Sequence, residues 1–336
     1  MQTTGLGQHA PRVSRIGLGC MGMSDLYGPA DRNESIATIH AALDAGITLL
    51  DTGDFYGMGH NELLIREALG SRPRDSVQIS VKFGALRGPD GAWNGYDCRP
   101  RAVRNFVAYT LKRLGTDYID IYRPARLDPE VPVEETVGAI ADLVKAGYVR
   151  HIGLSEVGAD TLRRASSVHP IGDLQIEYSV ISRGIEAAIL PTARALGIGI
   201  TAYGVLSRGL ISGHWSRERQ GEKDFRNLAS PRFQGDNLEA NLALVERMRA
   251  LAADLNVTVA QLAIAWVAAQ GAAHGHDVVP LVGARRRDRL QEALGAADLV
   301  LQPEDLARLE AMVSPNAAAG ERYNAAQMAH LDSEMG

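Results

Sequence analysis

Residues 48–70 read TLLDTGDFYGMGHNELLIREALG. The first four letters form a short apolar run that ends in Asp51, which predicts a β-strand. The last ten letters place apolar side chains every three or four positions and end in Gly70, which predicts an amphipathic helix with a glycine at its C-terminal cap. The stretch is therefore predicted to be a strand that leads into a helix.

The same alternation of strand and helix repeats eight times along the chain, before a helical C-terminal tail. The predicted strands are the apolar runs at 16–19, 48–51, 77–82, 119–122, 151–155, 174–179, 199–203 and 278–283. Further helices are predicted at 34–46 and 134–147, each ending in a glycine. Successive strand–helix–strand units need parallel pairing with right-handed crossovers, and eight of them can close into a barrel of about 250 residues plus insertions. The prediction is an α/β fold, a (β/α)8 TIM barrel.

A doubly wound open sheet is the alternative architecture. Its phosphate-binding turn normally reads G-x-G-x-x-G and opens a helix, whereas GLGCMG at 17–22 has another spacing and no clear helix start. No linker divides the chain, so residues 1–336 are expected to form one domain. Two long loops, 83–98 and 204–237, follow predicted strands and are expected to overhang the C-terminal face of the barrel, where active sites lie.

Composition restricts the function. The net charge is −5 over 336 residues, which gives no broad cationic field for nucleic acid or anionic lipid. A local basic cluster, Arg285, Arg286, Arg287 and Arg289, suits a small anionic ligand better. Only two cysteines are present, Cys20 and Cys98, which argues against a disulfide framework. With neither a signal-like nor a membrane-spanning segment evident, the expected location is cytoplasmic.

The segment between the strand and the helix carries the chemistry. It reads DTGDFYGMGHNE at 51–62, and Lys82 ends the next predicted strand. A barrel brings such strand ends together at its mouth. A phenol has an ordinary pKa near 10, so a nearby ammonium group would ease proton loss from Tyr56, and Asp51 would hold that ammonium. The expected roles are Tyr56 as general acid, Lys82 as its electrostatic partner and Asp51 as the orienting group.

This segment resembles the signature of the aldo-keto reductase family. The resemblance runs from RIGLGCMGMS at 15–24 to GERYNAAQMAHLDSE at 320–334. It implies a barrel enzyme that reduces an aldehyde or ketone to an alcohol with a nicotinamide cofactor. The family usually carries a His at the end of the fourth strand, but alignment on Asp128 and Pro129 puts Ala125 there. Alanine offers no side-chain hydrogen bond to a carbonyl group. Either Tyr56 polarises the carbonyl alone, or Arg123, Arg126 or a water molecule substitutes, or turnover is slow.

The resemblance also implies a cofactor site made of strand ends and the loops after them. Ser155 and Gln175 match residues that bind the nicotinamide carboxamide, and Tyr203 matches the ring that stacks on nicotinamide; a core tyrosine is the alternative for Tyr203. Asp51 is also a predicted cofactor contact, as are Gly19 and Met21 at the first strand. Gly204, Leu206 and Arg208 are predicted to bind the pyrophosphate. Gly283, Arg285 and Arg289 are predicted to bind a 2′-phosphate, and Glu292 is predicted to lie near the adenine. Paired arginines at a helix start favour NADPH over NADH, although a solvated arginine face is the alternative.

Trp93 and Tyr27 lie in the predicted mouth loops, and with Tyr56 and Arg126 they are the predicted substrate contacts. No metal is expected, since His274 and His276 have no third ligand nearby in the sequence. The expected partner is a small carbonyl substrate, without nucleic acid or membrane, and homo-oligomer formation stays open. Two other functions are considered: an NADPH-binding redox sensor with vestigial turnover, because of Ala125, and a lyase or isomerase on the same barrel.

Overall fold

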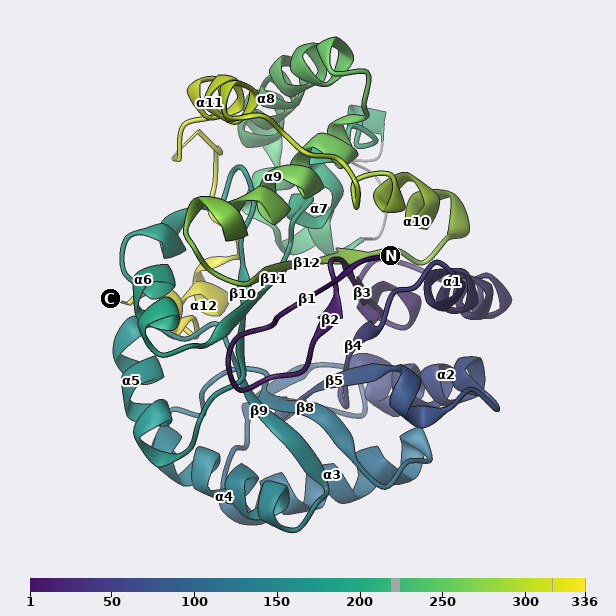
Figure 1. The fold of residues 1–336 in the computed structure, drawn as a ribbon, viewed down its shortest axis with the longest axis vertical. Helices are drawn as coiled ribbons and strands as arrows, with labels where there is room; N and C mark the ends of the chain where they lie inside the picture. Colours follow the sequence, from purple (N-terminus) through teal and green to yellow (C-terminus); the bar gives the residue numbers. More distant parts are fainter. Residues whose placement is uncertain (219–223, 316, 336) are drawn as a thin grey trace.

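The computed structural model describes residues 1–218, 224–315 and 317–335. Its centre is a closed barrel of eight strands, all paired in parallel (Figure 1). In order around the barrel, the strands are β3 (Gly17–Gly19), β4 (Leu49–Gly53), β5 (Gln78–Phe83), β8 (Ile119–Pro124), β9 (Val149–Ser155), β10 (Asp173–Glu177), β11 (Gly199–Tyr203) and β12 (Val278–Gly283). The predicted (β/α)8 barrel is confirmed, and each predicted strand overlaps an observed one.

Helices surround this barrel. They are α1 (Arg32–Asp44), α2 (His60–Leu69), α3 (Pro100–Leu114), α4 (Val133–Lys145), α5 (Ala159–Val168), α6 (Ile189–Ala195), α7 (Phe225–Ala229), α8 (Gly235–Asp254), α9 (Val259–Ala273), α10 (Arg287–Leu294), α11 (Pro303–Met312) and α12 (Ala325–Met328). The helices predicted at 34–46, 61–70 and 134–147 correspond to α1, α2 and α4. The glycines that follow them, Gly46, Gly70 and Gly147, all have positive φ, as a helix C-terminal cap requires.

Alternation along each strand determines which side chains enter the barrel. On β4, Leu50 packs in the main core beneath the helices, whereas Leu49 packs with Ile121 and Val279 in a second, smaller cluster. Because side chains alternate between the two faces of a strand, Asp51 shares the inner face with Leu49. Leu49 fills the barrel interior, and Asp51 lies one layer closer to the C-terminal mouth.

A short hairpin, β1 (Thr3–Thr4) and β2 (Val13–Ser14), lies at the N-terminal end of the barrel. Leu6 and Val13 are fully buried and belong to the inner cluster around Leu49. The backbone N–H of Gly7 donates to Asp277, just before β12, at 3.0 Å. The hairpin therefore plugs the end opposite the mouth. It was not predicted, because two-residue strands carry no periodic signal.

Both long mouth loops contain structure of their own. Loop 83–98 forms the antiparallel hairpin β6 (Ala85–Arg87) and β7 (Trp93–Tyr96). Loop 204–237 contains α7 and the first residues of α8, together with 3₁₀ turns. The described 3₁₀ turns of the chain are η1 (Met21–Met23), η2 (Tyr56–Gly59), η3 (Arg74–Ser76), η4 (Gly184–Glu186), η5 (Ser207–Ser212), η7 (Pro231–Phe233) and η8 (Asp332–Glu334).

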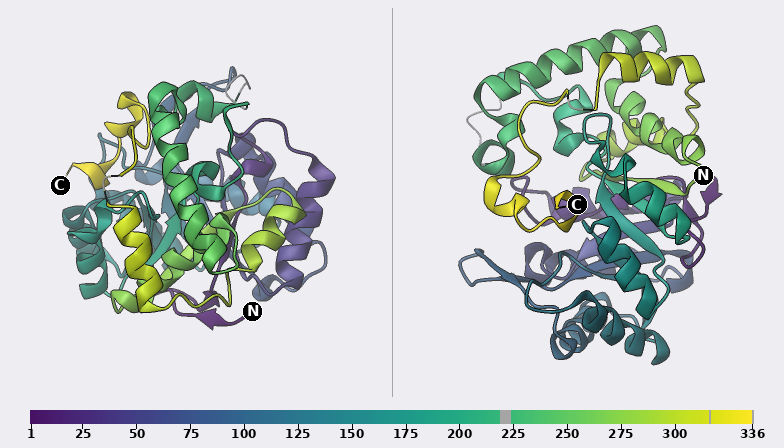
Figure 2. Two further views of the ribbon diagram at one scale, coloured as in Figure 1. Left: turned by 90° about the horizontal axis from the view of Figure 1, so that it is seen from above. Right: turned by 90° about the vertical axis from the view of Figure 1, so that its left-hand side faces the viewer.

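The C-terminal segment runs back to the barrel after α11, which packs on α8 (Figures 1 and 2). Its end docks beside β9, where the N–H of Gly158 donates to Asp332 at 2.7 Å and Ser333 donates to the backbone of Glu156 at 3.3 Å. In the described part of the chain no single helix is long and apolar enough to cross a membrane. Helices α8 and α9 meet the requirements of length and composition only as a pair, which is bent by 85°.

Candidate active site

Asp51 is the centre of a buried polar cluster at the C-terminal mouth. It forms an ion pair with Lys82 through one oxygen, while its other oxygen accepts hydrogen bonds from Ser80 at 2.9 Å and Gln175 at 2.7 Å. The pairing of β4 with β5 places Asp51 opposite Ser80 and Gly53 opposite Lys82, so these contacts follow from the strand register. Burial lowers the pKa of the Lys82 ammonium, and the attraction of Asp51 opposes this shift.

Tyr56 lies in η2, the turn between β4 and α2. The Lys82 ammonium lies over its ring, 5.5 Å from the centroid, and the Phe55 ring meets it edge-on at 4.8 Å. Gly57 and Met58, which follow, both have positive φ, a conformation that is costly for methionine and is common at functional sites. Burial, followed by the charge of Asp51, raises the pKa of Tyr56 well above its ordinary value. The phenol is therefore protonated at neutral pH.

Asn61 anchors this turn to the first strand. Its side chain accepts a hydrogen bond from Thr52 at 2.6 Å and donates to the backbone oxygen of Cys20 at 2.9 Å and to Ser24 at 2.8 Å. Asn61 is fully buried and is the second residue of α2. A residue predicted only to start a helix thus also holds the Tyr56 turn against the loop after β3.

Ala125 belongs to the same buried apolar cluster as Tyr56. The two residues share an apolar cluster with Phe55 and Ala85, on which Met21 and Tyr96 pack. Position 125 therefore contributes only a methyl group to the surroundings of the phenol. Unlike a histidine, alanine has no side-chain hydrogen-bond donor to offer at this position.

Arg123 does not replace the missing histidine. Its side chain is fully buried, donating to Asp173 at 3.0 Å and to Ser80 at 2.8 Å. These bonds hold the guanidinium across the barrel interior, because Ser80 is on β5 and Asp173 on β10. Of the two arginines considered from the sequence, only Arg126 remains available at the mouth.

Arg126 follows β8 and is partly exposed. It donates to the backbone oxygen of its neighbour Ala125 at 2.6 Å and to the Tyr323 hydroxyl at 3.3 Å. Its positive charge lowers the pKa of Tyr56, against the larger effect of burial. Arg126 therefore lies close enough to the phenol to act on it electrostatically.

The predicted nicotinamide contacts lie on adjacent strands. Ser155 on β9 pairs with Gln175 on β10, and Tyr203 ends β11. The Ser155 hydroxyl is buried and has no hydrogen-bond partner among the described residues. The Gln175 amide is engaged with Asp51 in this structure. Gly19 completes the ring of strand ends, pairing with Asp51 on one side and Gly283 on the other.

The loop after β11 is strained. Gly204, Ser207 and Arg208 all have positive φ, while Leu206 packs on the main core. The Arg208 guanidinium donates to the backbone oxygen of Arg322 at 2.5 Å. Arg208, predicted at the pyrophosphate, is thus bound to the C-terminal segment in this structure.

The predicted phosphate end follows β12. Arg285 donates to the backbone oxygens of Tyr27 and Gly28, at 2.8 and 3.1 Å. Arg289 lies at the start of α10, where it contacts His214 at 2.6 Å and Glu292 at 3.3 Å.

The other two arginines of this cluster are paired with carboxylates, Arg286 with Asp288 and Arg287 with Glu34. Beside them, Glu292 and His214 line a cavity of about 280 Å³. A larger hollow of about 630 Å³ lies between α2 and α3, around Arg66 and Ile79 at the N-terminal side of the barrel and away from Tyr56.

The two predicted substrate aromatics belong to neighbouring loops, since Arg87 lies over the Trp93 ring at 4.4 Å and pairs with Asp25, two residues before Tyr27. The Trp93 ring, on β7, is 5.7 Å from Phe55 and remains 44% exposed. The Tyr27 ring faces the Arg226 guanidinium at 4.9 Å, within the loop structure after β11. Among the described residues no group of three or more His, Cys, Asp or Glu side chains is arranged to hold a metal ion.

Comparison with known proteins shows the family to which this chain belongs. Residues 15–314 match the model of the aldo/keto reductase family. The chain is 42% identical over 328 residues to a probable aldo-keto reductase 1 of Glycine max, covering 96% of this chain and 92% of that protein. The chain belongs to the aldo-keto reductase family.

Solved structures agree with this assignment. The glycerol dehydrogenase of Gluconobacter oxydans superposes on this aldo-keto reductase with a TM-score of 0.83 at 28% identity, over 94% of this chain and 96% of that one. A thermostable aldo-keto reductase in complex with the inhibitor epalrestat gives a TM-score of 0.74 at 26% identity, over 93% of this chain and 100% of that one. The protein is thus an oxidoreductase of a family that reduces carbonyl groups and generally binds NAD(P)H.

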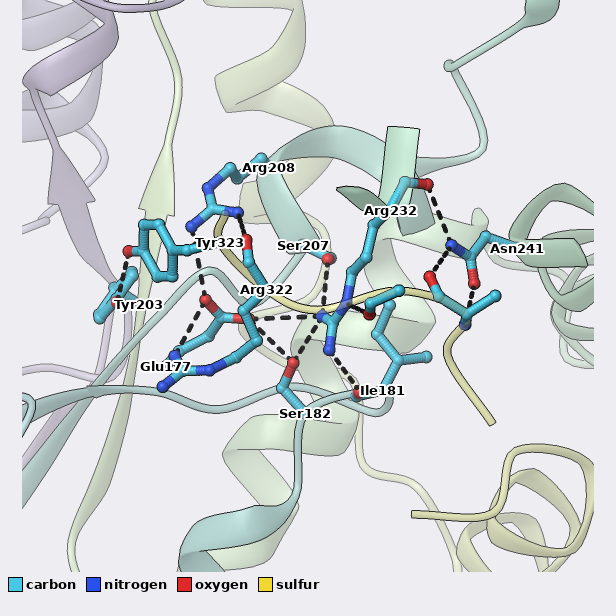
Figure 3. A network of polar contacts seen from close by, with 12 residues as sticks. Glu177, Ile181, Ser182, Tyr203, Ser207, Arg208, Arg232, Asn241, Arg322 and Tyr323 are labelled. Atoms are coloured by element: carbon cyan, nitrogen blue, oxygen red, sulfur yellow. Dashed lines mark hydrogen bonds and ion pairs between the residues drawn. The ribbon is translucent and has the colours of Figure 1, made fainter. Parts of the chain in front are cut away.

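This aldo-keto reductase also has a charged network at its mouth that sequence reasoning missed. Figure 3 shows Arg208, Arg232 and Arg322 converging on Glu177. Arg322 further pairs with Glu156 at 2.9 Å. Burial alone would raise the pKa values of both glutamates, but the arginines outweigh it, Arg322 most of all, and hold both below their ordinary range. The only local signals were Glu156 beside Ser155 and the arginine in GERYN at 320–324.

Proposed function

We propose that this aldo-keto reductase reduces an aldehyde or ketone with NADPH and that Tyr56 donates the proton to the carbonyl oxygen. The observation that carries the proposal is the buried ion pair of Asp51 and Lys82 beside a buried phenol at the barrel mouth. The raised pKa of Tyr56 keeps its proton in place until a carbonyl oxygen develops negative charge. The assignment to this family favours reduction over the lyase or isomerase alternative.

The residues fit a nicotinamide nucleotide. A buried hydroxyl group without a partner is costly, so the unpaired Ser155 oxygen suits a ligand amide that lies against β9. A Cβ added to Gly283 would meet nothing within 4 Å, so the chain is open at the end of β12. Arg285 and Arg289 favour NADPH over NADH, because only NADPH carries a 2′-phosphate that these guanidinium groups could bind. Bound NADPH would supply the hydride.

Side chains of the protein carry out the proton transfer. Tyr56 donates a hydrogen bond to the substrate oxygen and passes its proton to it as the alcohol forms. The phenolate that remains is stabilised by the positive charge of Lys82, which lies over the Tyr56 ring. Asp51 keeps Lys82 charged in its buried position and fixes it through the contacts with Ser80 and Gln175. With a methyl group at Ala125, the Tyr56 phenol is the donor nearest to the reacting carbonyl.

The test is the substitution Tyr56→Phe, with Tyr109→Phe as the matched control because Tyr109 is 57% exposed. NADPH and NADH are titrated by protein fluorescence, and turnover is measured on a panel of aldehydes, ketones and quinones. Tyr56→Phe is expected to lower kcat by about a hundredfold or more, with the Kd for NADPH unchanged. Unchanged turnover would refute the role of Tyr56. Tight NADPH binding by the unmodified protein without any turnover would favour the alternative function, an NADPH-binding sensor.

A further inference from the structure

Arg126 is a cation without an anionic partner in the described chain. No Asp or Glu side chain of the described residues lies within 4.0 Å of its guanidinium; its hydrogen bonds go to the Ala125 carbonyl oxygen and the Tyr323 hydroxyl. Its guanidinium also lies 5.9 Å from the centre of the Tyr323 ring. These neutral contacts orient the side chain, and its guanidinium forms no direct ion pair with a described carboxylate, while the charge of Glu156 acts on it from beyond 4.0 Å.

The nearby carboxylates are already occupied. Glu156 accepts hydrogen bonds from Arg322 at 2.9 Å, from Ser333 at 2.6 Å and from the Tyr203 hydroxyl at 2.7 Å. Glu177 is shared by three guanidinium groups, those of Arg208, Arg232 and Arg322, at 3.8, 3.5 and 3.2 Å. In the described part of this cluster, four guanidinium groups, those of Arg126, Arg208, Arg232 and Arg322, meet three carboxylates, those of Glu156, Glu177 and Glu334.

A guanidinium that is partly withdrawn from water and lacks a direct ion pair is costly, and an anionic ligand would relieve that cost. The predicted phosphate contacts of the cofactor come from the loops after β11 and β12, whereas Arg126 follows β8. The cofactor's phosphates are therefore not expected to neutralise Arg126. This leaves the substrate as the source of the anion.

We infer that the carbonyl substrate carries a carboxylate and that Arg126 binds it. Arg126 is adjacent to Ala125, which shares a buried cluster with Tyr56, so an anion held by Arg126 lies near the proposed proton donor. A guanidinium presents paired N–H groups that match the two oxygens of a carboxylate, and the Tyr323 hydroxyl is a further donor beside it. The favoured substrate class is therefore an oxo acid. The inference rests on the proposed carbonyl reduction.

The experiment compares anionic carbonyl compounds with neutral isosteres of similar size. The anionic set is phenylglyoxylate, 3-carboxybenzaldehyde and 4-carboxybenzaldehyde, and the neutral set is methyl phenylglyoxylate and the two carbamoylbenzaldehydes. The unmodified protein is expected to prefer at least one anion over its isostere by tenfold or more in kcat/KM. Arg126→Gln should lower kcat/KM for that anion by about tenfold to a hundredfold, mainly through KM, and change the neutral partner less than threefold.

Two further variants control this comparison. Arg126→Lys keeps the charge and should retain part of the preference, even if Arg126→Gln folds poorly. Arg104→Gln removes an exposed arginine that pairs with Asp142 and should change nothing. Equal kcat/KM for anion and isostere in the unmodified protein would overturn the inference. So would an equal loss for both in Arg126→Gln, because that result would mean that Arg126 polarises the carbonyl itself.

A binding measurement separates this inference from the proposed function. Benzoate and benzamide are titrated into the protein with NADP+ by isothermal calorimetry. The inference predicts that benzoate binds more tightly and that Arg126→Gln removes the difference, whether or not any aldehyde is turned over. Absence of turnover together with this binding pattern would refute the reductase alone. Equal binding of the two probes, or a benzoate preference that survives Arg126→Gln, would refute the role of Arg126.

Discussion

The phenolic hydroxyl of Tyr323 lies 2.9 Å from that of Tyr203. Tyr203 ends β11 and is the ring predicted to stack on nicotinamide, while Tyr323 belongs to the C-terminal segment that returns to the mouth. The Arg208 guanidinium covers the Tyr323 ring at 4.1 Å, so the loop after β11 and the tail meet on one residue. The C-terminal segment is thus part of the candidate active site.

Arg322 is expected to be the residue that attaches this segment most strongly. Arg322→Ala would leave Glu156 and Glu177 as buried carboxylates without their main partner. Breaking a buried ion pair from one side costs about 3–5 kcal/mol, so the free energy of unfolding should fall by that amount. Urea denaturation measures the loss.

The control for this prediction is Arg308→Ala. Arg308 pairs with Asp254 on the surface, where both side chains are about half exposed, and such pairs contribute about 1 kcal/mol or less. Equal losses in the two variants would show that the buried network does not hold the segment in place.

Asp54 should destabilise the folded protein increasingly as pH rises. Burial, and then the charge of Glu62, raise its pKa well above the ordinary value, and one of its oxygens has no hydrogen-bond partner among the described residues. Unfolded, Asp54 releases its proton near pH 3.9, whereas the folded protein retains it to a higher pH. Stability is therefore lost as pH rises from the unfolded pKa to the folded pKa. The stability of Asp54→Asn relative to the unmodified protein should grow over that range.

Chemical denaturation at successive pH values from 4 to 8 checks this prediction. Asp142→Asn is the control, because Asp142 is 65% exposed and pairs with an exposed arginine. Its difference from the unmodified protein should vary little with pH. A difference for Asp54→Asn that stays constant or shrinks with rising pH would contradict the assigned shift.

Arg289 is expected to distinguish NADPH from NADH. Its guanidinium is 44% exposed at the start of α10 and contacts Glu292, and a hydrogen bond between charged groups is worth about 1.5–3 kcal/mol. Arg289→Gln should therefore raise the Kd for NADPH by about tenfold to a hundredfold and change the Kd for NADH less than twofold. Fluorescence titration of both nucleotides measures this.

Arg286→Gln provides the comparison, because Arg286 is the more exposed neighbour and is paired with Asp288. It should leave both dissociation constants nearly unchanged. If Arg289→Gln weakens NADPH and NADH equally, the preference for the phosphorylated cofactor does not depend on this residue.

Local signals explain why the barrel could be predicted. The strand and helix in residues 48–70 are defined by side-chain patterns over a few neighbouring residues. The N-terminal hairpin could not be predicted in this way. Its strands are too short for a pattern, and it is held in place by contacts with residues such as Leu49 and Asp277, far along the chain.

The sequence by itself determined the order of strands and helices, the turn that carries Tyr56, and the absence of a polar side chain at Ala125, because each depends on neighbouring residues. Only the tertiary structure decided between Arg123 and Arg126, since the two differ in what the closed barrel places around them: Asp173 holds the first inside, and Tyr323 meets the second at the mouth. The pairing of Glu156 with Arg322, 166 residues apart, likewise exists only once the barrel is closed and the tail has returned to it. Charged groups interact according to their distance in space and not along the sequence, and the fold sets that distance.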